Sequence, residues 1–180
     1  MKYLSPAVGV RVYDNAINNC QDIVKWCDNK IWQQSGVSIN GIIDADKRTS
    51  KTIFIPFFSY SNDDIIHNMN KKVWTLFDEY AKDWGFTFSR VEDASVQKYD
   101  VGDFYKLHTD SGPGMLRIVS AVVYLNTVKK GGRTIFPHID ISVEPIEGRI
   151  VIFPSDYIYA HEAEAPESNT KYAAAYWAIP

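Results

Sequence analysis

The feature that most constrains the fold is a succession of short apolar runs in the second half of the chain, after Val91. The runs are rich in β-branched and aromatic residues, and turn residues such as Gly, Asp, Asn and Pro separate them. They are Ser95–Tyr99, Phe104–Leu107, Leu116–Leu125, Thr134–Phe136, Ile141–Val143, Arg149–Phe153 and Tyr172–Ile179. Short strands at this spacing are typical of an antiparallel sandwich or jelly roll.

The first half contains two stretches with helical periodicity. Apolar residues recur every three or four positions in both stretches. These residues are Ala16, Ile17, Cys20, Ile23, Val24 and Cys27 in the first, and Ile66, Met69, Val73, Leu76, Phe77, Tyr80 and Trp84 in the second. We expect Asp14 to be the N-cap of the first helix. The second helix should begin near Ser61 or Asn62 and stop at Gly85.

The rest of the first half predicts strands and a loop. Val8–Tyr13 and Ile53–Phe58 have the composition of strands, and residues 34–52 predict a polar loop or a weak strand pair. Helices that come first and strands that come later indicate an α+β fold, in which helices buttress one face of a β-core. With no repeat or linker visible, we expect a single domain over residues 1–180.

Composition narrows the class of protein. Hydrophobic residues make up 46% and charged residues 23% of the chain, and a net charge of −3 predicts no nucleic-acid or membrane partner. No apolar run approaches the roughly 18 residues of a membrane span. The N-terminal MKYLSPAVGVRVYDN lacks the apolar segment of a signal peptide. Cys20 and Cys27 should lie about 10 Å apart along one helix, too far for a disulfide, so we expect core thiols in a cytoplasmic protein.

Two of the four histidines fit a metal site. His67 falls beside the apolar stripe of the second helix, and we expect it to be a solvated or half-buried helix residue. His138 follows a proline, and we expect it to be a turn residue. His108 and Asp110 stand two apart at the end of a strand-like run and should point to the same side. With His161 they would make the two-histidine, one-carboxylate face that suits non-haem Fe(II) and leaves positions open.

The last predicted strand adds a cation to the same side. Lys171, Ala173, Ala175 and Trp177 share one face by alternation. An inward-facing lysine needs an anion, and the two alanines leave room for one. Thr134, after the Gly-Gly turn, could support the same anion. A carboxylate cosubstrate that chelates iron at one end and pairs with lysine at the other has the shape of 2-oxoglutarate.

Several segments in order resemble the prolyl 4-hydroxylase family of Fe(II)/2-oxoglutarate-dependent dioxygenases. They are YDVGDFYKLHTD (99–110), LRIVSAVVYLNTVKKGGRTIFP (116–137), EGRIVIFP (147–154) and His161 with Lys171 ten residues later. The resemblance covers about residues 93–180 and is weaker in the first half, where KRTSKTIFI (47–55) resembles the family's Arg-Thr-Ser segment. It implies a double-stranded β-helix (jelly-roll) catalytic core at about 93–180.

The resemblance also implies roles for residues in three groups. The metal ligands are His108, Asp110 and His161; the cosubstrate-binding residues are Lys171, Tyr99, Thr134 and Tyr124; the substrate-side residues are Arg117, Tyr105 and Trp177. The cofactors implied are Fe(II), 2-oxoglutarate, O₂ and ascorbate as reductant. The activity implied is hydroxylation of a C–H bond, with peptidyl proline as the favoured substrate and succinate and CO₂ as coproducts.

Other activities stay open beside this one. A 2-oxoglutarate oxygenase acting on a free amino acid or another small molecule would need the same iron face. A nucleic-acid demethylase is disfavoured by the anchoring lysine and by the lack of a basic stripe. A cupin-like binding domain or a structural zinc site is the non-catalytic alternative. The short chain without a secretory signal predicts a compact, stand-alone enzyme of microbial or viral type, with Lys30–Lys51 and Ser111–Gly114 as lids over the site.

Overall fold

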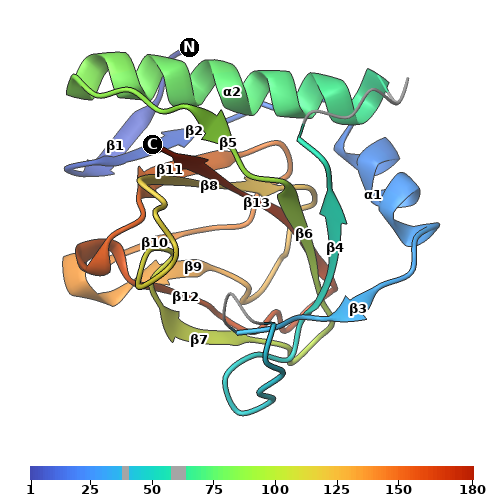
Figure 1. Ribbon diagram of the computed structural model, residues 1–180. Helices are drawn as coiled ribbons and strands as arrows, with labels where there is room; N and C mark the ends of the chain where they lie inside the picture. Colours follow the sequence, from blue (N-terminus) through green and yellow to red (C-terminus); the bar gives the residue numbers. More distant parts are fainter. Residues whose placement is uncertain (38–40, 58–63) are drawn as a thin grey trace.

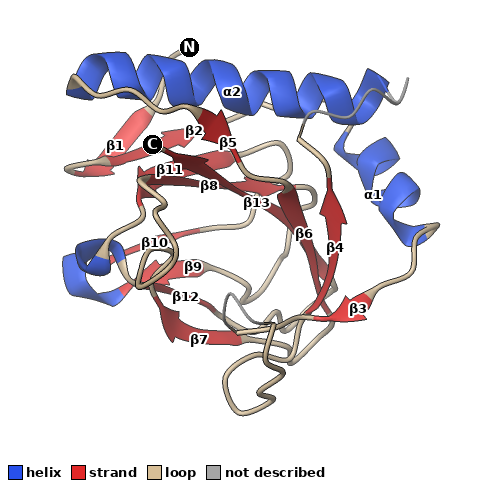
Figure 2. Ribbon diagram, viewed as in Figure 1, coloured by secondary structure: helices blue, strands red, loops and turns tan. Residues whose placement is uncertain are grey.

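Two antiparallel sheets and two α-helices make up the described part of the chain in the computed structural model, residues 1–37, 41–57 and 64–180 (Figures 1 and 2). The helices are α1 (Cys20–Asp28) and α2 (Asp64–Trp84), and two short 3₁₀ turns, η1 (Pro137–Ile139) and η2 (Tyr157–Tyr159), accompany them. The expected helix start near Ser61 or Asn62 lies outside the described residues. The strand expected over Ile53–Phe58 ends earlier, at Ile55, and Phe58 itself lies outside the described residues.

The larger sheet joins strands from both ends of the chain. Its order is β1-β2-β11-β8-β13-β6-β4-β3, with β5 also paired to β13, and the smaller sheet has the order β10-β9-β12-β7. The strands are β1 (Leu4–Ala7), β2 (Val10–Tyr13), β3 (Gln33–Gln34), β4 (Lys51–Ile55), β5 (Arg90–Val91), β6 (Ala94–Tyr99), β7 (Tyr105–His108), β8 (Val119–Tyr124), β9 (Thr134–Phe136), β10 (Ile141–Val143), β11 (Ile150–Pro154), β12 (His161–Ala163) and β13 (Lys171–Ile179). Each of the seven runs expected after Val91 overlaps one of these strands, so that prediction is confirmed.

The two sheets face each other, and α2 lies across the outer face of the larger one (Figure 1). Strand β13 shows how the layers are built. Its even-numbered residues, such as Tyr172, Ala174 and Tyr176, belong to the main core cluster together with α1 and α2. Its odd-numbered residues from Lys171 to Trp177 face the interior between the sheets. This arrangement is the expected double-stranded β-helix core, with helices buttressing one face.

The first half of the chain contributes to both sides of the larger sheet. Strand β2 pairs with β11 at one side, and β4 pairs with β6 at the other. The short ladder of β3 with β4 is the weak strand pair expected within the polar segment. The second helix ends at Trp84, before Gly85, as predicted.

Three local expectations were wrong. Helix α1 begins at Cys20 after Asn19, whereas Asp14 pairs with Arg149 at 2.6 Å and caps no helix. Ala16 and Ile17 are nevertheless buried, because their amides bond to the Gly148 carbonyl at 2.8 and 3.1 Å and hold the segment against the core. Trp84, which the apolar pattern groups with the buried face of the helix, is 50% exposed at the end of α2.

Cys20 and Cys27 are both buried free thiols on α1, as expected. Burial raises the pKa of the Cys20 thiol to about 11, which keeps it protonated and unreactive at neutral pH. Among the described residues, neither helix is long and apolar enough to cross a membrane.

Candidate metal and cosubstrate site

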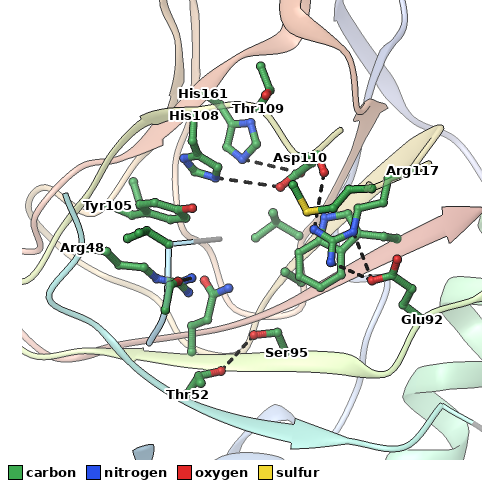
Figure 3. Close-up of a pocket in the computed structure, with 18 of the residues that line it drawn as sticks. Arg48, Thr52, Glu92, Ser95, Tyr105, His108, Thr109, Asp110, Arg117 and His161 are labelled. Carbon is green, nitrogen blue, oxygen red and sulfur yellow. Dashed lines mark hydrogen bonds and ion pairs between the residues drawn. The ribbon is translucent and has the colours of Figure 1, made fainter. Parts of the chain in front are cut away.

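The three expected metal ligands converge at one end of the smaller sheet. His108 closes β7 and His161 opens β12, and the two residues are cross-strand partners. Asp110 follows β7, and its Oδ1 and Oδ2 lie 3.9 Å from His108 Nε2 and 3.8 Å from His161 Nε2. One ligand atom from each residue lies within 4.8 Å of the others. Figure 3 shows Thr109 directed away from this point, as the pleat predicts.

Hydrogen bonds behind the ligands orient them. His108 Nδ1 lies 2.9 Å from the Lys106 carbonyl, and His161 Nδ1 lies 3.1 Å from the Tyr159 carbonyl. A carbonyl only accepts, so each Nδ1 carries the proton and each Nε2 presents a lone pair. Ser120 Oγ donates to Asp110 Oδ2 at 2.7 Å and fixes the carboxylate.

The electrostatics favour the protonation states that a cation needs. Burial, and then the proximity of His161, lowers the pKa of His108 to about 3, so the imidazole is neutral. Burial alone would raise the pKa of Asp110. The two histidines and the Ser120 hydrogen bond outweigh burial, so that pKa lies below its usual value. Two neutral imidazoles and one carboxylate are the donors expected for a divalent metal ion. The residues present therefore fit Fe(II).

Lys171 is a buried lysine whose ammonium group has no counter-ion among the described residues. Lys171 is 2% exposed, and its Nζ lies 5.2 Å from the centroid of the Tyr99 ring and 5.5 Å from that of the Tyr124 ring. Nζ donates to the Gly132 carbonyl at 2.7 Å, and no carboxylate oxygen of the described residues lies within 4.0 Å of it. Burial lowers the pKa of Lys171 to about 7. An entering anion would remove this desolvation cost.

A glycine turn places the carbonyl that holds Lys171. Gly131 and Gly132 have φ of +71° and +76°, and a Cβ at Gly131 would lie 2.4 Å from the Ala165 carbonyl oxygen. Only glycine fits the first position without moving the backbone. The Gly-Gly pair that appeared in the sequence as a small-residue turn therefore has a defined task beside the lysine.

The remaining cosubstrate candidates surround this lysine. Tyr124 donates its hydroxyl proton to Thr134 Oγ1 at 2.7 Å, and Tyr99 donates to Gln97 Oε1 at 2.8 Å. Thr134 and Tyr99 line the cavity, whereas Tyr124 lies behind Thr134 in the core between the sheets. Tyr124 is thus placed to orient the threonine rather than to line the cavity itself.

A cavity of about 1390 Å³ connects the metal ligands to Lys171. The odd-numbered face of β13 forms part of its wall, and the small side chains of Ala173 and Ala175 leave the space open, as expected. Described parts of Lys30–Lys51 and all of Ser111–Gly114 also line it. Their location at the cavity is as predicted, while their action as lids stays a prediction.

The three expected substrate-side residues, Tyr105, Arg117 and Trp177, also line the cavity. Figure 3 shows Tyr105 and Arg117. The Tyr105 ring stacks on the His108 ring with centroids 3.6 Å apart. Arg117 lies over the Trp177 ring at 3.7 Å and is held by Glu92, whose Oε2 accepts from Arg117 Nη2 at 2.7 Å.

Sequence reasoning missed three contributors. Ser120 and Glu92 stand in no recognisable local pattern, because their partners Asp110 and Arg117 are distant in the chain. Arg48 lies in the segment that resembles the family, but no role was expected for it. It stacks over Tyr105 at 4.3 Å and lines the cavity. The sequence alone does not distinguish this buried arginine from an arginine on the surface.

The other histidines lie outside the site, as expected. His67 is exposed on α2. His138 lies in η1, exposed, with Nδ1 3.1 Å from the Tyr157 carbonyl.

The sequence is similar to a known protein family and to individual members of it. Residues 94–179 match the family model of the 2OG-Fe(II) oxygenase superfamily. A protein of Acanthamoeba polyphaga mimivirus, named as a candidate prolyl 4-hydroxylase, is 24% identical over 156 residues. That match covers 79% of this chain and 59% of the relative, so the chain spans less than two thirds of the relative's length.

Solved structures share the fold. The prolyl hydroxylase of Trichoplax adhaerens, in complex with a peptide fragment of the hypoxia inducible factor oxygen degradation domain, superposes with a TM-score of 0.81 at 20% identity, covering 95% of this chain and 83% of that one. A Pseudomonas putida prolyl 4-hydroxylase gives a TM-score of 0.77 at 17% identity, covering 95% and 92%. At this identity the structures establish the double-stranded β-helix fold alone.

Proposed function

We propose that this chain, whose residues 94–179 match the family model of the 2OG-Fe(II) oxygenase superfamily, hydroxylates a C–H bond of a peptide substrate, with proline as the favoured residue. The observation that carries the proposal is the meeting of His108, Asp110 and His161 with the unpaired Lys171 in one cavity. An open metal face and a buried cation side by side are what binding of 2-oxoglutarate requires.

Fe(II) with 2-oxoglutarate and O₂ would supply the oxidising power, and succinate and CO₂ would leave as coproducts. The protein's own residues would hold the iron and the cosubstrate and orient them. His108, Asp110 and His161 would ligate the iron, and Lys171 would pair with the far carboxylate of 2-oxoglutarate, next to Thr134. The protonated Lys171 compensates the carboxylate charge inside a cavity where an unpaired anion would be costly.

The substrate-side residues would position the reacting C–H bond. Tyr105 covers one face of His108 and restricts where a substrate approaches the iron. Arg117 and Trp177 form a rigid pair, since Glu92 fixes the guanidinium over the ring. Such preorganised side chains reduce the entropy lost when a substrate is held close to the reacting centre.

The names of similar proteins favour a peptidyl substrate. The mimivirus relative is named for prolyl 4-hydroxylation, and the Trichoplax enzyme was solved with a bound peptide. We further propose that ascorbate serves as the reductant after uncoupled turnovers. We also propose that residues 1–180 form one domain with its catalytic core at about 93–180.

The decisive experiment measures succinate from protein incubated with Fe(II), 2-oxoglutarate and ascorbate, with and without proline-containing peptides. We expect peptide-stimulated succinate and a 16 Da mass gain on the peptide, the mass of one oxygen atom. His108→Ala should abolish both, together with Fe(II) binding. His67→Ala, at an exposed position on α2, is the matched control and should change neither.

Absence of succinate with every peptide and unchanged Fe(II) affinity in His108→Ala would together refute the oxygenase proposal. Succinate formed without any peptide modification, but stimulated by a free amino acid, would keep the reaction and replace the substrate.

A further inference from the structure

Arg48 is a second buried cation at the cavity, beside Tyr105. The residue is 8% exposed and lines the cavity. Its Nε donates to Ser50 Oγ and its Nη1 to the Gly36 carbonyl, both at 2.9 Å. Nη2 is buried and has no hydrogen-bond partner among the described residues. No carboxylate of those residues lies within ion-pair distance of this guanidinium.

The local fold keeps Arg48 in this position. Its neighbour Lys47 accepts a backbone bond from the Lys106 amide at 2.9 Å, and Arg48 bridges to Tyr105. Two neutral hydrogen bonds and an aromatic ring orient the guanidinium without neutralising it. A buried, unpaired charge with an unsatisfied nitrogen is unfavourable, and a ligand carboxylate would remove both penalties.

The surroundings of Arg48 are also basic. Lys106 lines the cavity, is exposed and has no carboxylate partner in the described part of the chain. Lys47 lines it as well, although Asp44 lies 3.5 Å from its ammonium group. This end of the cavity is thus positive in a chain whose net charge is −3. The opposite end carries the Arg117–Glu92 pair, which is internally neutral.

The distance from the metal site defines where a bound carboxylate would lie on a peptide. Arg48 stacks on Tyr105 at 4.3 Å, and Tyr105 stacks on His108 at 3.6 Å. Figure 3 shows Arg48, Tyr105 and His108 in that order along one wall. An extended peptide advances about 3.3 Å per residue, so Arg48 is reached roughly two or three residues from the residue that faces the iron.

We infer that Arg48 is a carboxylate receptor that selects peptide substrates with an aspartate or glutamate two or three residues from the hydroxylated position. Lys106 and Lys47 contribute a positive field that favours such peptides. The inference rests on the proposed hydroxylase function and adds the sequence preference of its substrate. Guanidinium and carboxylate form two parallel hydrogen bonds, which gives direction as well as affinity.

A peptide fits this end of the cavity better than a nucleic acid. Exposed aliphatic and aromatic side chains line the same cavity, namely Phe54, Leu107 and Leu116. Apolar side chains in the same cavity as one receptor for a single carboxylate match an acidic peptide. A phosphate backbone would be expected to meet a row of cations instead.

The test uses acetylated and amidated peptides with one central proline, so that only side-chain carboxylates differ. Glutamate is placed two or three residues before or after the proline, and each peptide is paired with its glutamine counterpart. Affinity is measured by fluorescence anisotropy on the full-length protein with a chelator present, so the readout does not depend on turnover. At one of these positions the glutamate peptide should bind about tenfold more tightly than its glutamine partner.

Protein variants assign the preference to named residues. Arg48→Gln keeps one donor, an amide nitrogen near the position of Arg48 Nε that can bond Ser50 Oγ, and it should abolish the glutamate preference. Lys106→Glu, at an exposed position, should reduce it and make it less sensitive to salt. Lys129→Gln removes an exposed lysine that does not line the cavity, and it should leave the preference intact. If Arg48→Gln does not fold, the peptide pairs on the native protein together with Lys106→Glu still test whether this end of the cavity selects acidic peptides.

The outcomes separate this inference from the proposed function. Peptide hydroxylation with equal affinity for every glutamate and glutamine pair would overturn the receptor and leave the hydroxylase standing. A glutamate preference that depends on Arg48, without succinate from any peptide and with unchanged Fe(II) affinity in His108→Ala, would support the receptor and refute the hydroxylase. Tighter binding of a single-stranded oligonucleotide than of the acidic peptides would overturn the inference in favour of a nucleic-acid partner.

Discussion

At the residue scale, each side chain of the proposed metal site contacts the protein through one polar atom and presents another polar atom to the metal position. His108 and His161 turn Nδ1 to backbone carbonyls, and Ser120 occupies one carboxylate oxygen of Asp110. These contacts limit the rotamers of the ligands before any metal binds. Loss of a supporting hydrogen bond of this kind typically lowers metal affinity about 10–100-fold.

Ser120→Ala should weaken Fe(II) binding about tenfold, because the freed Asp110 carboxylate can rotate away from the histidines. Anaerobic titration of Fe(II), or of Mn(II) as a redox-stable substitute, measures the effect. The matched control is Ser155→Ala. Ser155 Oγ contacts Ser120 Oγ at 2.8 Å and makes no contact with the carboxylate, so the loss should be smaller. Equal losses in both variants would contradict a direct role for Ser120.

Lys171 should make 2-oxoglutarate binding depend on pH. Burial lowers its pKa from 10.5 to about 7, and the nearby Glu164 opposes this only in part. The free protein therefore loses this proton as pH rises through about 7, whereas the anion binds the charged form. Above that pH we expect affinity to fall about tenfold per pH unit and binding to take up a proton.

Calorimetry in buffers of different ionisation enthalpy measures this proton uptake. Lys171→Arg keeps its charge across the range and should remove both the uptake and the pH dependence. Unchanged uptake in that variant would assign the proton to another group. In the ligand-free protein, the contribution of Lys171 to stability should increase from about pH 7 towards pH 10.5, since the unfolded lysine stays protonated there.

At the element scale, the two faces of β13 have different tasks. Odd-numbered residues line the cavity and even-numbered residues pack against α1 and α2. Alternation along the sequence was sufficient to predict this, because the period of a strand is two in any sheet. The start of helix α1 was harder to predict from the sequence. Ala16 and Ile17 continue the apolar pattern, yet they are buried through a contact with Gly148 that is distant in sequence.

Leucine substitutions on the two faces of β13 should have opposite effects. Ala173→Leu projects into the cavity and should reduce 2-oxoglutarate affinity at least tenfold while largely keeping the thermal midpoint. Ala174→Leu projects into the packed core and should cost about 1–3 kcal/mol of unfolding free energy. Chemical denaturation and 2-oxoglutarate titration of both variants check this. A destabilised Ala173→Leu with normal affinity would show that the faces are assigned wrongly.

At the scale of the whole molecule, strands from the first half enclose the core of the second. Strand β2 covers the free side of β11, β4 covers that of β6, and α2 packs on the outer face of the same sheet. The family match begins at residue 94, but the sheet that carries Lys171 does not end there. The boundary of a sequence match is therefore no boundary of the fold here.

A fragment of residues 94–180 should accordingly fail to fold alone. It would expose two sheet edges and the apolar face that α2 covers, which leads to aggregation. We expect no cooperative thermal transition by circular dichroism and rapid proteolysis, in contrast to the full chain. A fragment that melts cooperatively and binds Fe(II) would contradict the single-domain proposal.

The sequence by itself determined the strands of the second half, the long helix, the three converging ligands and the inward lysine. These features depend on periodicity and on ordered motifs, which short-range geometry imposes wherever the chain lies. Only the tertiary structure decided where α1 begins, that Ser120 and Glu92 support Asp110 and Arg117, and that Arg48 is buried with no counter-ion in the described part of the chain. Each of these depends on partners brought together by strand pairing and packing, and no local pattern encodes which distant group completes a hydrogen bond or leaves a charge unpaired.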